Sequence, residues 1–500
     1  MIIVHNDYIR VLGLEATRRG RTALEALRKE TAYLVAGHEH TDKFQSGVWD
    51  GRIQLVRRSR RGKRGEPKPL LIPTGLLAVA QRHLKGYRFA DKRRRPKGRM
   101  DFEWVGPDPR GYQGEAVRAI LDRCRVRGLA PRGIIKVPIR GGKTLIAGRI
   151  LAELGWSTLF VVESEMLLGQ TARALRSYLH PRSFRDEWIG VCGSGEWDPR
   201  WVTVATVQTL LARPREARAL EAKTDLLLID EVHHMRADEW RKPIMRTDAF
   251  GKIGLSATLF EDPDIPQERS AIWVRACTGP IRYEVPIERL IQEGHLLQPT
   301  VLLYRMPLHG APQRWRYGRT YSEFIANNEE RNATIADLAE QAAKAGLLTL
   351  IDTGRLDQMR RLEEMLSARG VEVETLHGST PPARRRRVVE RFQKRKVAVV
   401  IGTILGEGVD IPELEVVINA EGGKSRIAVM QRLRNLTVSE GKTRAIVIDF
   451  ADLGQRHMQE HSLARLDLYD ETRGFRIRVI EGMTRPARIP DDLLPGSSGL

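Results

Sequence analysis

Short apolar runs alternate with longer amphipathic stretches through most of the chain beyond residue 110. The runs are rich in Val, Ile and Leu and resemble buried strands, whereas the stretches between them repeat with a helical period. This alternation is typical of parallel strands joined by crossover helices. It predicts an α/β protein with two parallel sheets in tandem. The predicted strands lie at 134–137, 158–162, 202–206, 225–229 and 252–255, then at 347–351, 371–376, 398–401, 416–419 and 445–450, with helices at 113–125 and 143–154.

The first 105 residues have a different pattern, in which short apolar runs are mixed with Gly, Pro and Arg. A length of 500 residues fits about three domains. We expect a small domain at 1–105, α/β domains at 106–285 and 286–455, and a C-terminal extension at 456–500. The Pro- and Gly-containing stretch 280–298 is expected to connect the two sheets. Residues 456–480 are expected to form a helix followed by a strand.

The composition is that of a chain with buried cores, because hydrophobic residues make up 41% and charged residues 29%. No stretch approaches the ~18 apolar residues of a membrane span, and the start MIIVHNDYIR lacks the layout of a signal peptide. We therefore expect a cytoplasmic protein without a membrane partner. Cys124, Cys192 and Cys277 are far apart, which argues against structural zinc and a disulfide framework.

The charge is strongly basic and unevenly distributed. The chain has 83 Lys and Arg against 63 Asp and Glu, a net charge of +20, and residues 51–100 alone hold 17 basic residues and two acids. Two basic runs, at 57–64 and 92–99, together predict a surface that binds nucleic-acid phosphates. Either run alone also fits a solvated loop. The predicted contacts are Arg57, Arg58, Arg60, Arg61, Lys92, Arg93, Arg94 and Arg95.

Residues 134–144 combine a predicted strand, a glycine-containing loop and the start of a helix, the arrangement of a phosphate-binding loop. Gly141 and Gly142 allow backbone N–H groups to approach an anion, and the helix N-terminus adds partial positive charge. Lys143 supplies a charge for the terminal phosphates, and the Thr144 hydroxyl can ligate Mg²⁺. Taken alone, the segment also fits an ordinary strand-to-helix turn.

Two acids, Asp230 and Glu231, directly follow the apolar run 226–229. The carboxyl ends of parallel strands share one edge of a sheet, so we expect these acids beside the phosphate loop, on a neighbouring strand. Asp230 could hold Mg²⁺ while Glu231 polarises the attacking water. Acids after a strand can also be plain N-caps or surface charges. The two motifs together predict a site that hydrolyses nucleoside triphosphates.

The ordered motifs resemble those of superfamily 2 helicases with a DExH box, which here is the segment 230–233. The resemblance covers most of the chain and implies two RecA-like domains. Gln113 occupies the place of the adenine-reading glutamine, while 161–170 and 204–208 resemble segments of the nucleic-acid track. Ser256, Ala257 and Thr258 match the SAT motif, which couples the nucleotide site to the nucleic acid in this family.

In the second sheet, 377–380 and 402–412 resemble the fourth and fifth motif regions, and 430–434 resembles the sixth. By resemblance, Gln431, Arg432 and Arg434 are the catalytic residues that stabilise the transferring phosphoryl group, together with Lys143, Asp230 and Glu231. The implied nucleotide contacts are Gln113, Gly141, Gly142, Lys143, Thr144, His233, Gly408 and Asp410. The arginines at 384–387 either contact phosphates or form the wet side of a helix that buries Val388 and Phe392.

The N-terminal sequence FQSGVWDG at 44–51, followed by PTGLL at 73–77, resembles the N-terminal domain of phage recombination helicases. This resemblance implies branched DNA as the substrate. Trp49 within the motif is either a base-stacking residue or a buried core aromatic.

The chain departs from the family pattern at two places. Val137 and Arg140 stand where the family has a small residue and a glycine, and the Cβ of Arg140 restricts the backbone there. In the sixth motif no glycine separates Leu433 from Arg434, and Thr437 stands where the last arginine is usual. An active ATPase and a weak or partner-activated one both fit these departures.

Three functions fit the sequence. The favoured hypothesis is an ATP- and Mg²⁺-dependent DNA helicase or translocase that unwinds or branch-migrates forks and recombination junctions, in contact with recombination or replication proteins. A double-strand translocase without strand separation is the first alternative. A DNA-binding scaffold with a weakened ATPase is the second. RNA in place of DNA stays open, because phosphate contacts do not specify the sugar.

Overall fold

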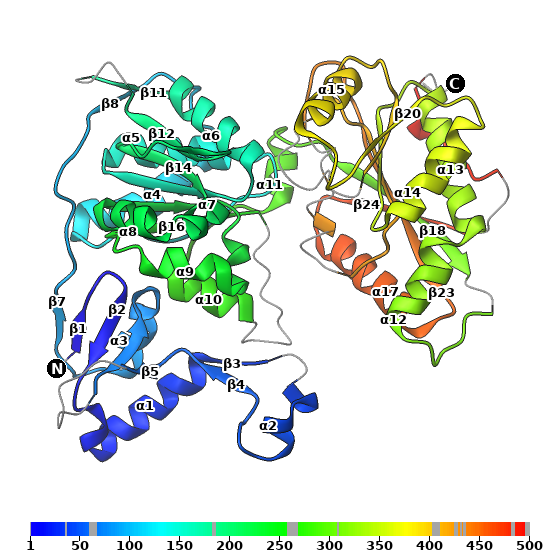
Figure 1. Cartoon of the computed structure of the whole chain (residues 1–500). Helices are drawn as coiled ribbons and strands as arrows, with labels where there is room; N and C mark the ends of the chain where they lie inside the picture. The colour runs from blue at the N-terminus through cyan, green and yellow to red at the C-terminus, as the bar shows by residue number, and fades with distance from the viewer. Residues whose placement is uncertain are drawn as a thin grey trace. The chain divides into compact units, whose positions relative to one another are not determined.

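The computed structural model describes all residues except 1, 36–37, 60–67, 183–186, 258–268, 308–309, 403–410, 425–428, 431–432, 434–436, 482–485 and 496–500. Its contacts divide the chain into two compact units. Unit 1 contains residues 1–138 and 142–285, and unit 2 contains 286–500 together with 139–141. Figure 1 shows the helices and strands of each unit.

The N-terminal part of unit 1 contains a five-stranded sheet that packs on one hydrophobic core. Helix α1 (Arg18–Glu30) contributes Leu24 and Leu27 to this core, and α10 (Arg269–Thr278) contributes Ile272 and Ala276. The predicted small domain thus has a sheet of its own but shares its core with a helix of the following α/β domain. The strand order is β5 (Arg57–Arg58), β6 (Leu70–Pro73), β2 (Tyr8–Val11), β1 (Ile2–Val4) and β7 (Phe89–Asp91), and α3 (Leu77–His83) follows β6.

A two-stranded hairpin, β3 (Ala32–Leu34) and β4 (Arg52–Gln54), carries the short helix α2 (Asp42–Gln45) between its strands. Trp49, in the same connection, is half-buried, and its indole N–H donates to the Arg52 carbonyl at 2.7 Å. This aromatic ring is therefore neither a fully buried core residue nor a freely exposed one.

The N-terminal sheet is joined to the α/β part of unit 1 by buried polar contacts. The Asn6 amide donates to the carbonyls of Arg94 and Asp248 at 3.1 and 3.0 Å. Arg132, only 8% exposed, donates from Nη2 to the Asn6 carbonyl at 2.6 Å and from Nε to the Phe250 carbonyl at 3.0 Å. These bonds fix the N-terminal sheet against the amino ends of the parallel strands.

The α/β part of unit 1 contains an eight-stranded sheet that is parallel except at β13. All five strands predicted in this part are present. The order is β13 (Glu196–Trp197), β12 (Ile189–Gly193), β14 (Val202–Thr206), β10 (Thr158–Val162), β15 (Leu226–Ile229), β16 (Gly251–Ser256), β9 (Arg132–Lys136) and β17 (Ile281–Glu284). Strand β17 lies inside the predicted connection 280–298, so the first sheet extends further along the chain than predicted.

This part also contains the helices α4 (Gly111–Arg127), α5 (Lys143–Leu154), α6 (Glu165–Tyr178), α7 (Val207–Ala212), α8 (Pro214–Lys223) and α9 (Asp238–Arg246). Helices α4 and α5 are the two that the sequence predicts. A small separate sheet pairs β8 (Phe102–Trp104) with β11 (Leu179–Pro181).

Unit 2 contains a seven-stranded parallel sheet. The order is β20 (Val373–Leu376), β21 (Val399–Gly402), β19 (Thr349–Asp352), β22 (Val416–Asn419), β23 (Ala445–Leu453), β18 (Pro299–Pro307) and β24 (Arg476–Ile480). The predicted helix and strand at 456–480 are confirmed as α17 (Arg456–Glu471) and β24. Because β24 pairs with β18, this part of the expected extension is the edge of the second sheet.

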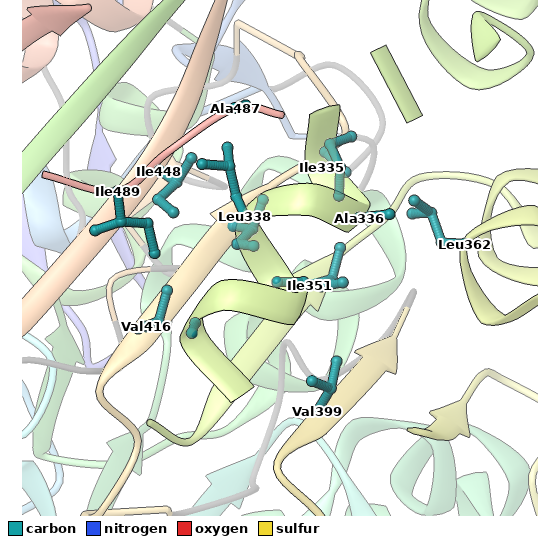
Figure 2. Packing of buried hydrophobic residues seen from close by; sticks show 14 of the residues in the cluster. Ile335, Ala336, Leu338, Ile351, Leu362, Val399, Val416, Ile448, Ala487 and Ile489 are labelled. Carbon is teal, nitrogen blue, oxygen red and sulfur yellow. The ribbon is translucent and has the colours of Figure 1, made fainter. Parts of the chain in front are cut away.

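The other helices of unit 2 are α11 (Ile287–Gln292), α12 (Tyr317–Tyr321), α13 (Glu329–Lys344), α14 (Leu356–Ser367) and α15 (Pro382–Gln393). Figure 2 shows Ile335 and Leu338 of α13 packed with Ile351, Val416 and Ile448 of three strands. Val417 belongs to a different core cluster than its neighbour Val416, because successive strand residues point to opposite faces. Both faces of the sheet are therefore buried, as parallel sheets require.

The described residues thus form an α/β protein with two mainly parallel sheets, as the sequence predicts. Within those residues, no helix combines the length and apolar character that crossing a bilayer demands.

Candidate functional site

The predicted phosphate loop leads from β9 into α5, which begins at Lys143. Gly142 has a left-handed φ of 77°, and a Cβ at this position would lie 2.4 Å from Gln113 Nε2. A side chain at this position would therefore be strained and would displace the Gln113 amide. Arg140 also has a positive φ, of 68°, at the position where the sequence predicts that a Cβ restricts the backbone. Arg140 thus adopts the left-handed backbone conformation at a position where the family pattern has a glycine.

Gln113 lies beside this loop at the start of α4 and is only 3% exposed. Its Oε1 accepts a hydrogen bond from the Arg110 backbone N–H at 2.9 Å. The side chain is therefore fixed next to Gly142.

The predicted acids stand at the carboxyl end of β15 and meet the loop lysine. Lys143 Nζ forms an ion pair with Glu231 Oε1 and lies 4.0 Å from Asp230 Oδ1. Asp230 Oδ1 accepts the Glu231 backbone N–H at 3.0 Å, and Glu231 has a left-handed φ of 44°. The two motifs are not on neighbouring strands, however, because β16 lies between β15 and β9. The long lysine side chain spans the strand that separates them.

Burial and charge set the protonation of these groups. Burial raises the pKa of Asp230 to about 6, against the attraction of Lys143. Burial also favours neutral Glu231, but Lys143 and His233 outweigh it, so the pKa of Glu231 is lowered. Burial lowers the pKa of Lys143, yet Glu231 and Asp230 outweigh it and raise that pKa. These directions favour a charged Lys143 and an ionised Glu231 carboxylate at neutral pH.

His233 connects this acid pair to the strand between the two motifs. Its Nδ1 lies 3.2 Å from Glu231 Oε2 and 3.2 Å from Ser256 Oγ, at the end of β16. Burial lowers the pKa of His233 although Glu231 opposes this, which favours the neutral imidazole. Ser256 is fully buried and the adjacent Ala257 is half-buried. The geometry therefore links the start of the SAT segment to Glu231 through one histidine.

A second histidine contact was not predicted from the sequence. His234 Nε2 lies 2.7 Å from Oε1 of Glu163, which directly follows β10. The His234 ring stacks on Trp240 with centroids 4.9 Å apart and also packs against His233 at 4.3 Å. The sequence does contain a signal for Glu163, because it directly follows a buried strand, as Asp230 and Glu231 follow β15.

The structure gives most of the basic run at 92–95 internal partners. Arg93 pairs with Asp91 at 2.6 Å, and its side chain is only 6% exposed. Arg94 pairs with Asp225 at 2.5 Å and donates to the carbonyls of Thr224 and Asp248 at 2.7 and 2.9 Å. Arg95 donates to the Gly128 carbonyl and lies 4.8 Å from the Phe250 ring centroid. Lys92 is exposed. The run therefore has a structural role alongside any contact with phosphates.

The other basic run is described only at its start. Arg57 is exposed, lies 5.1 Å from the Tyr8 ring centroid and donates to the Tyr8 hydroxyl at 2.5 Å. Arg58 pairs with Glu15 at 2.6 Å, and its side chain is 54% exposed. Arg60 and Arg61 lie outside the described residues.

Several predicted residues lie outside the described part of the chain and stay predictions. They are Thr258, Gly408, Asp410, Gln431, Arg432 and Arg434. Thr144 is in the first turn of α5 and half-buried. In α15, Val388 and Phe392 are buried while Arg384, Arg386 and Arg387 are exposed on the solvent side of the helix, and a contact of these arginines with phosphates stays a prediction.

Comparison with known proteins gives two matches to family models. Residues 107–261 match the family described as the res subunit of type III restriction enzymes, and residues 330–434 match the helicase conserved C-terminal domain. Together the matched segments contain the phosphate loop, the acids and the predicted sixth motif.

Similar proteins come from several sources. Rad25 of Halobacterium salinarum is 28% identical over 407 residues, which are 80% of this chain and 63% of that protein. This chain thus spans less than two thirds of the length of that relative. The ATP-dependent DNA helicase uvsW of Enterobacteria phage T4 is a homologue, 23% identical over 463 residues, or 85% of this chain and 86% of the phage protein. The structure of S. cerevisiae Dbp5 bound to RNA and ADP BeF3 has a TM-score of 0.53 at 16% identity, covering 75% of this chain and 90% of that one, and shares its fold.

Proposed function

This chain belongs to the superfamily 2 helicases, and on that premise we propose that it is an ATP-dependent DNA motor that unwinds or branch-migrates forks and recombination junctions. The observation that carries the proposal is the contact of Lys143 Nζ with the acids after β15. This contact brings a phosphate-binding charge and a general base into one site, as hydrolysis of a nucleoside triphosphate requires.

The residues present fit ATP and Mg²⁺. Gly142 leaves the room beside Gln113 that a Cβ would fill, and the N-terminus of α5 offers N–H groups to phosphates. Thr144 and Asp230 would hold the metal, which when bound neutralises phosphate charge. Lys143 would bind the terminal phosphates, and Glu231 would orient the attacking water and accept its proton.

Conversion of hydrolysis into movement needs a second set of contacts. We assign stabilisation of the transferring phosphoryl group to Gln431, Arg432 and Arg434, by resemblance to the sixth motif of the family. Ser256, Ala257 and Thr258 would couple the nucleotide to DNA from the first RecA-like domain, and Gly408 and Asp410 from the second. His233 supports the coupling role of the segment 256–258, because it contacts both Glu231 and Ser256.

DNA is the proposed polymer because the chain carries a net charge of +20 and its phage homologue is named a DNA helicase. Within the basic N-terminal part, Arg57, Arg58 and Lys92 are exposed and would contact phosphates. The proposed setting is recombination, replication or repair in the cytoplasm, with proteins of those processes as partners. A translocase that does not separate strands is the alternative, and RNA as the polymer stays open.

A strand-displacement assay on a forked duplex, run beside displacement of a triplex-forming strand, tests the proposal. Lys143→Ala in parallel reports dependence on the nucleotide site. Fork unwinding that requires Lys143 supports a helicase, whereas triplex displacement without fork unwinding supports the translocase. DNA binding with no Lys143-dependent phosphate release would contradict both and leave the scaffold.

A further inference from the structure

An arginine- and aromatic-rich segment follows β18 in unit 2 and has no role in the site described above. We call residues 313–321, with the sequence QRWRYGRTY, the RWRY segment. It contains Arg314, Arg316 and Arg319 and no acid, and it ends in helix α12. All three arginines are exposed. Within the described residues, Arg314 and Arg316 form no ion pair, so their charges are available to an anion.

The aromatic side chains of the segment are partly exposed beside these charges. Tyr317 is 39% exposed, and it is the one aromatic among the exposed large apolar side chains of the described residues. Its ring packs against Tyr321 and His461, with centroids 5.8 and 4.9 Å away, which holds it in place. Trp315 is half-buried, with the Arg319 guanidinium 3.9 Å from its ring centroid. A fixed aromatic ring that follows the exposed Arg316 in the chain suits an unpaired base and its phosphate.

The segment is anchored at the carboxyl edge of the second sheet. Gln313 Nε2 donates to the Gly454 carbonyl at 2.6 Å, just beyond β23, and Gln313 Oε1 accepts the Arg456 N–H at 3.0 Å. At the other end, Tyr321 lies next to Gly354, just beyond β19, and the Arg355 guanidinium is 5.5 Å from the Tyr321 ring centroid. Figure 1 shows α12 beside α17 in this unit.

This location gives the segment a connection to the predicted motor elements of the same unit. The segments 377–380 and 402–412, which resemble the fourth and fifth motif regions of the family, follow β20 and β21 in the sequence. Because all seven strands are parallel, β20 and β21 end at the same edge of the sheet as β18, which the RWRY segment follows.

We infer that the RWRY segment is a binding surface for single-stranded nucleic acid, in which Arg314 and Arg316 contact phosphates and Tyr317 stacks on a base. Single strands are favoured over duplex because a duplex keeps its bases paired and away from an exposed ring. The inference rests on the proposed function, since it extends the path of the DNA across the second domain.

The test measures binding of a fluorescein-labelled 20-nucleotide oligo-dT and of a 20-base-pair duplex to the full chain by anisotropy, at five KCl concentrations. The double variant Arg314→Ala/Arg316→Ala should flatten the plot of log K against log salt for oligo-dT by about 1.4, because each single-strand phosphate contact contributes about 0.7. The matched control is Arg360→Ala/Arg361→Ala, which removes two adjacent exposed arginines from α14 and should leave the plot unchanged.

Tyr317→Ala should weaken oligo-dT binding about tenfold without changing that slope, since stacking involves no counterion release. Tyr317→Trp should restore binding, which a merely structural role of the tyrosine would not predict. Thermal unfolding of each variant verifies the fold. Unchanged oligo-dT affinity and slope in the arginine variant would overturn the inference, and so would equal losses for duplex and single strand. Failure of the proposed function would be seen separately, as phosphate release that does not depend on Lys143.

Discussion

Arg94 Nη1 lies 2.5 Å from Asp225 Oδ1, a contact between residues 131 positions apart that joins the N-terminal sheet to the start of β15. The Asp225 side chain is only 5% exposed and that of Arg94 25%. The same guanidinium donates to two backbone carbonyls of the α/β part. A residue that looks like a phosphate contact in the sequence therefore fixes two parts of unit 1 to each other.

Arg94→Ala should lower the stability of the fold by about 2–3 kcal/mol, because it leaves the buried Asp225 carboxylate without its partner. Lys92→Ala, which removes an exposed charge two residues away, should change stability by less than about 0.5 kcal/mol. Thermal unfolding measures both. Duplex binding should distinguish the variants in the opposite way. The slope of log K against log salt should fall in magnitude by about 0.9 for Lys92→Ala and stay unchanged for Arg94→Ala. A flattened slope with unaltered unfolding for Arg94→Ala would refute the structural role.

Substitutions at Arg140 test the strain in the phosphate loop. The left-handed φ of 68° costs a non-glycine residue roughly 1–2 kcal/mol, and glycine avoids this while losing about 0.5–1 kcal/mol in chain entropy. Arg140→Gly should therefore change the unfolding free energy by less than about 1 kcal/mol. Arg140→Val should destabilise the chain by more than the glycine variant, because a β-branched side chain fits this backbone least. Urea unfolding of the two variants gives their order, and a valine variant more stable than the glycine one would be inconsistent with this backbone.

Glu163→Gln tests whether the contact with His234 positions the catalytic centre. We expect kcat for ATP hydrolysis to fall about tenfold, or ~1.4 kcal/mol, with little change in KM. The reason is that the His234 ring packs on His233, which contacts Glu231. Glu165→Gln, at an exposed position of α6, is the matched control. Equal rates for the two variants would show that Glu163 has no part in positioning.

Lys252 should make the stability of the fold depend on pH. It is 1% exposed, its Nζ donates to the Ile244 carbonyl at 3.0 Å, and burial lowers its pKa from the usual 10.5 to about 7. Between the pKa of the folded chain and that of the unfolded chain, the unfolded lysine binds a proton that the folded lysine does not. The free-energy cost of burying the charged lysine is therefore full below pH 7 and decreases as the pH rises towards 10.5.

The unfolding free energy of the wild type should therefore rise relative to Lys252→Met between pH 7 and 10, by at most about 1.4 kcal/mol per pH unit. Urea unfolding at three pH values measures this difference. Lys223→Met, at an exposed lysine, should run parallel to the wild type. Parallel profiles for Lys252→Met as well would mean that the buried lysine keeps its charge at every pH tested.

The sequence predicts the central strands well because their apolar runs are continuous, as in β15, where all four residues are buried. It misses β17 and β18, in which charged residues interrupt the apolar pattern or prolines bound it. Strand β17 has Arg282 and Glu284 among its four residues, and β18 begins and ends with proline. These segments become strands because they pair with a neighbouring strand, and a local sequence pattern contains no information about that pairing.

Site prediction follows the same division. Gln113, Lys143 and the two acids are found by motif because their chemistry depends on short segments at fixed places in the chain. The pairing of Glu163 with His234 depends on two strands that are adjacent only in the folded sheet. The role of Arg94 likewise depends on a distant partner, since a basic run has the same sequence whether it binds phosphates or Asp225.

Steady-state ATP hydrolysis by wild type and Glu231→Gln tests the central claim most directly, with no DNA, single strands, duplex and a four-way junction at two salt concentrations. The account predicts a rate that the junction stimulates, that higher salt reduces, and that Glu231→Gln lowers by about 10²–10⁴-fold. A rate at background on every substrate while DNA is still bound, or one that Glu231→Gln leaves unchanged, would contradict it.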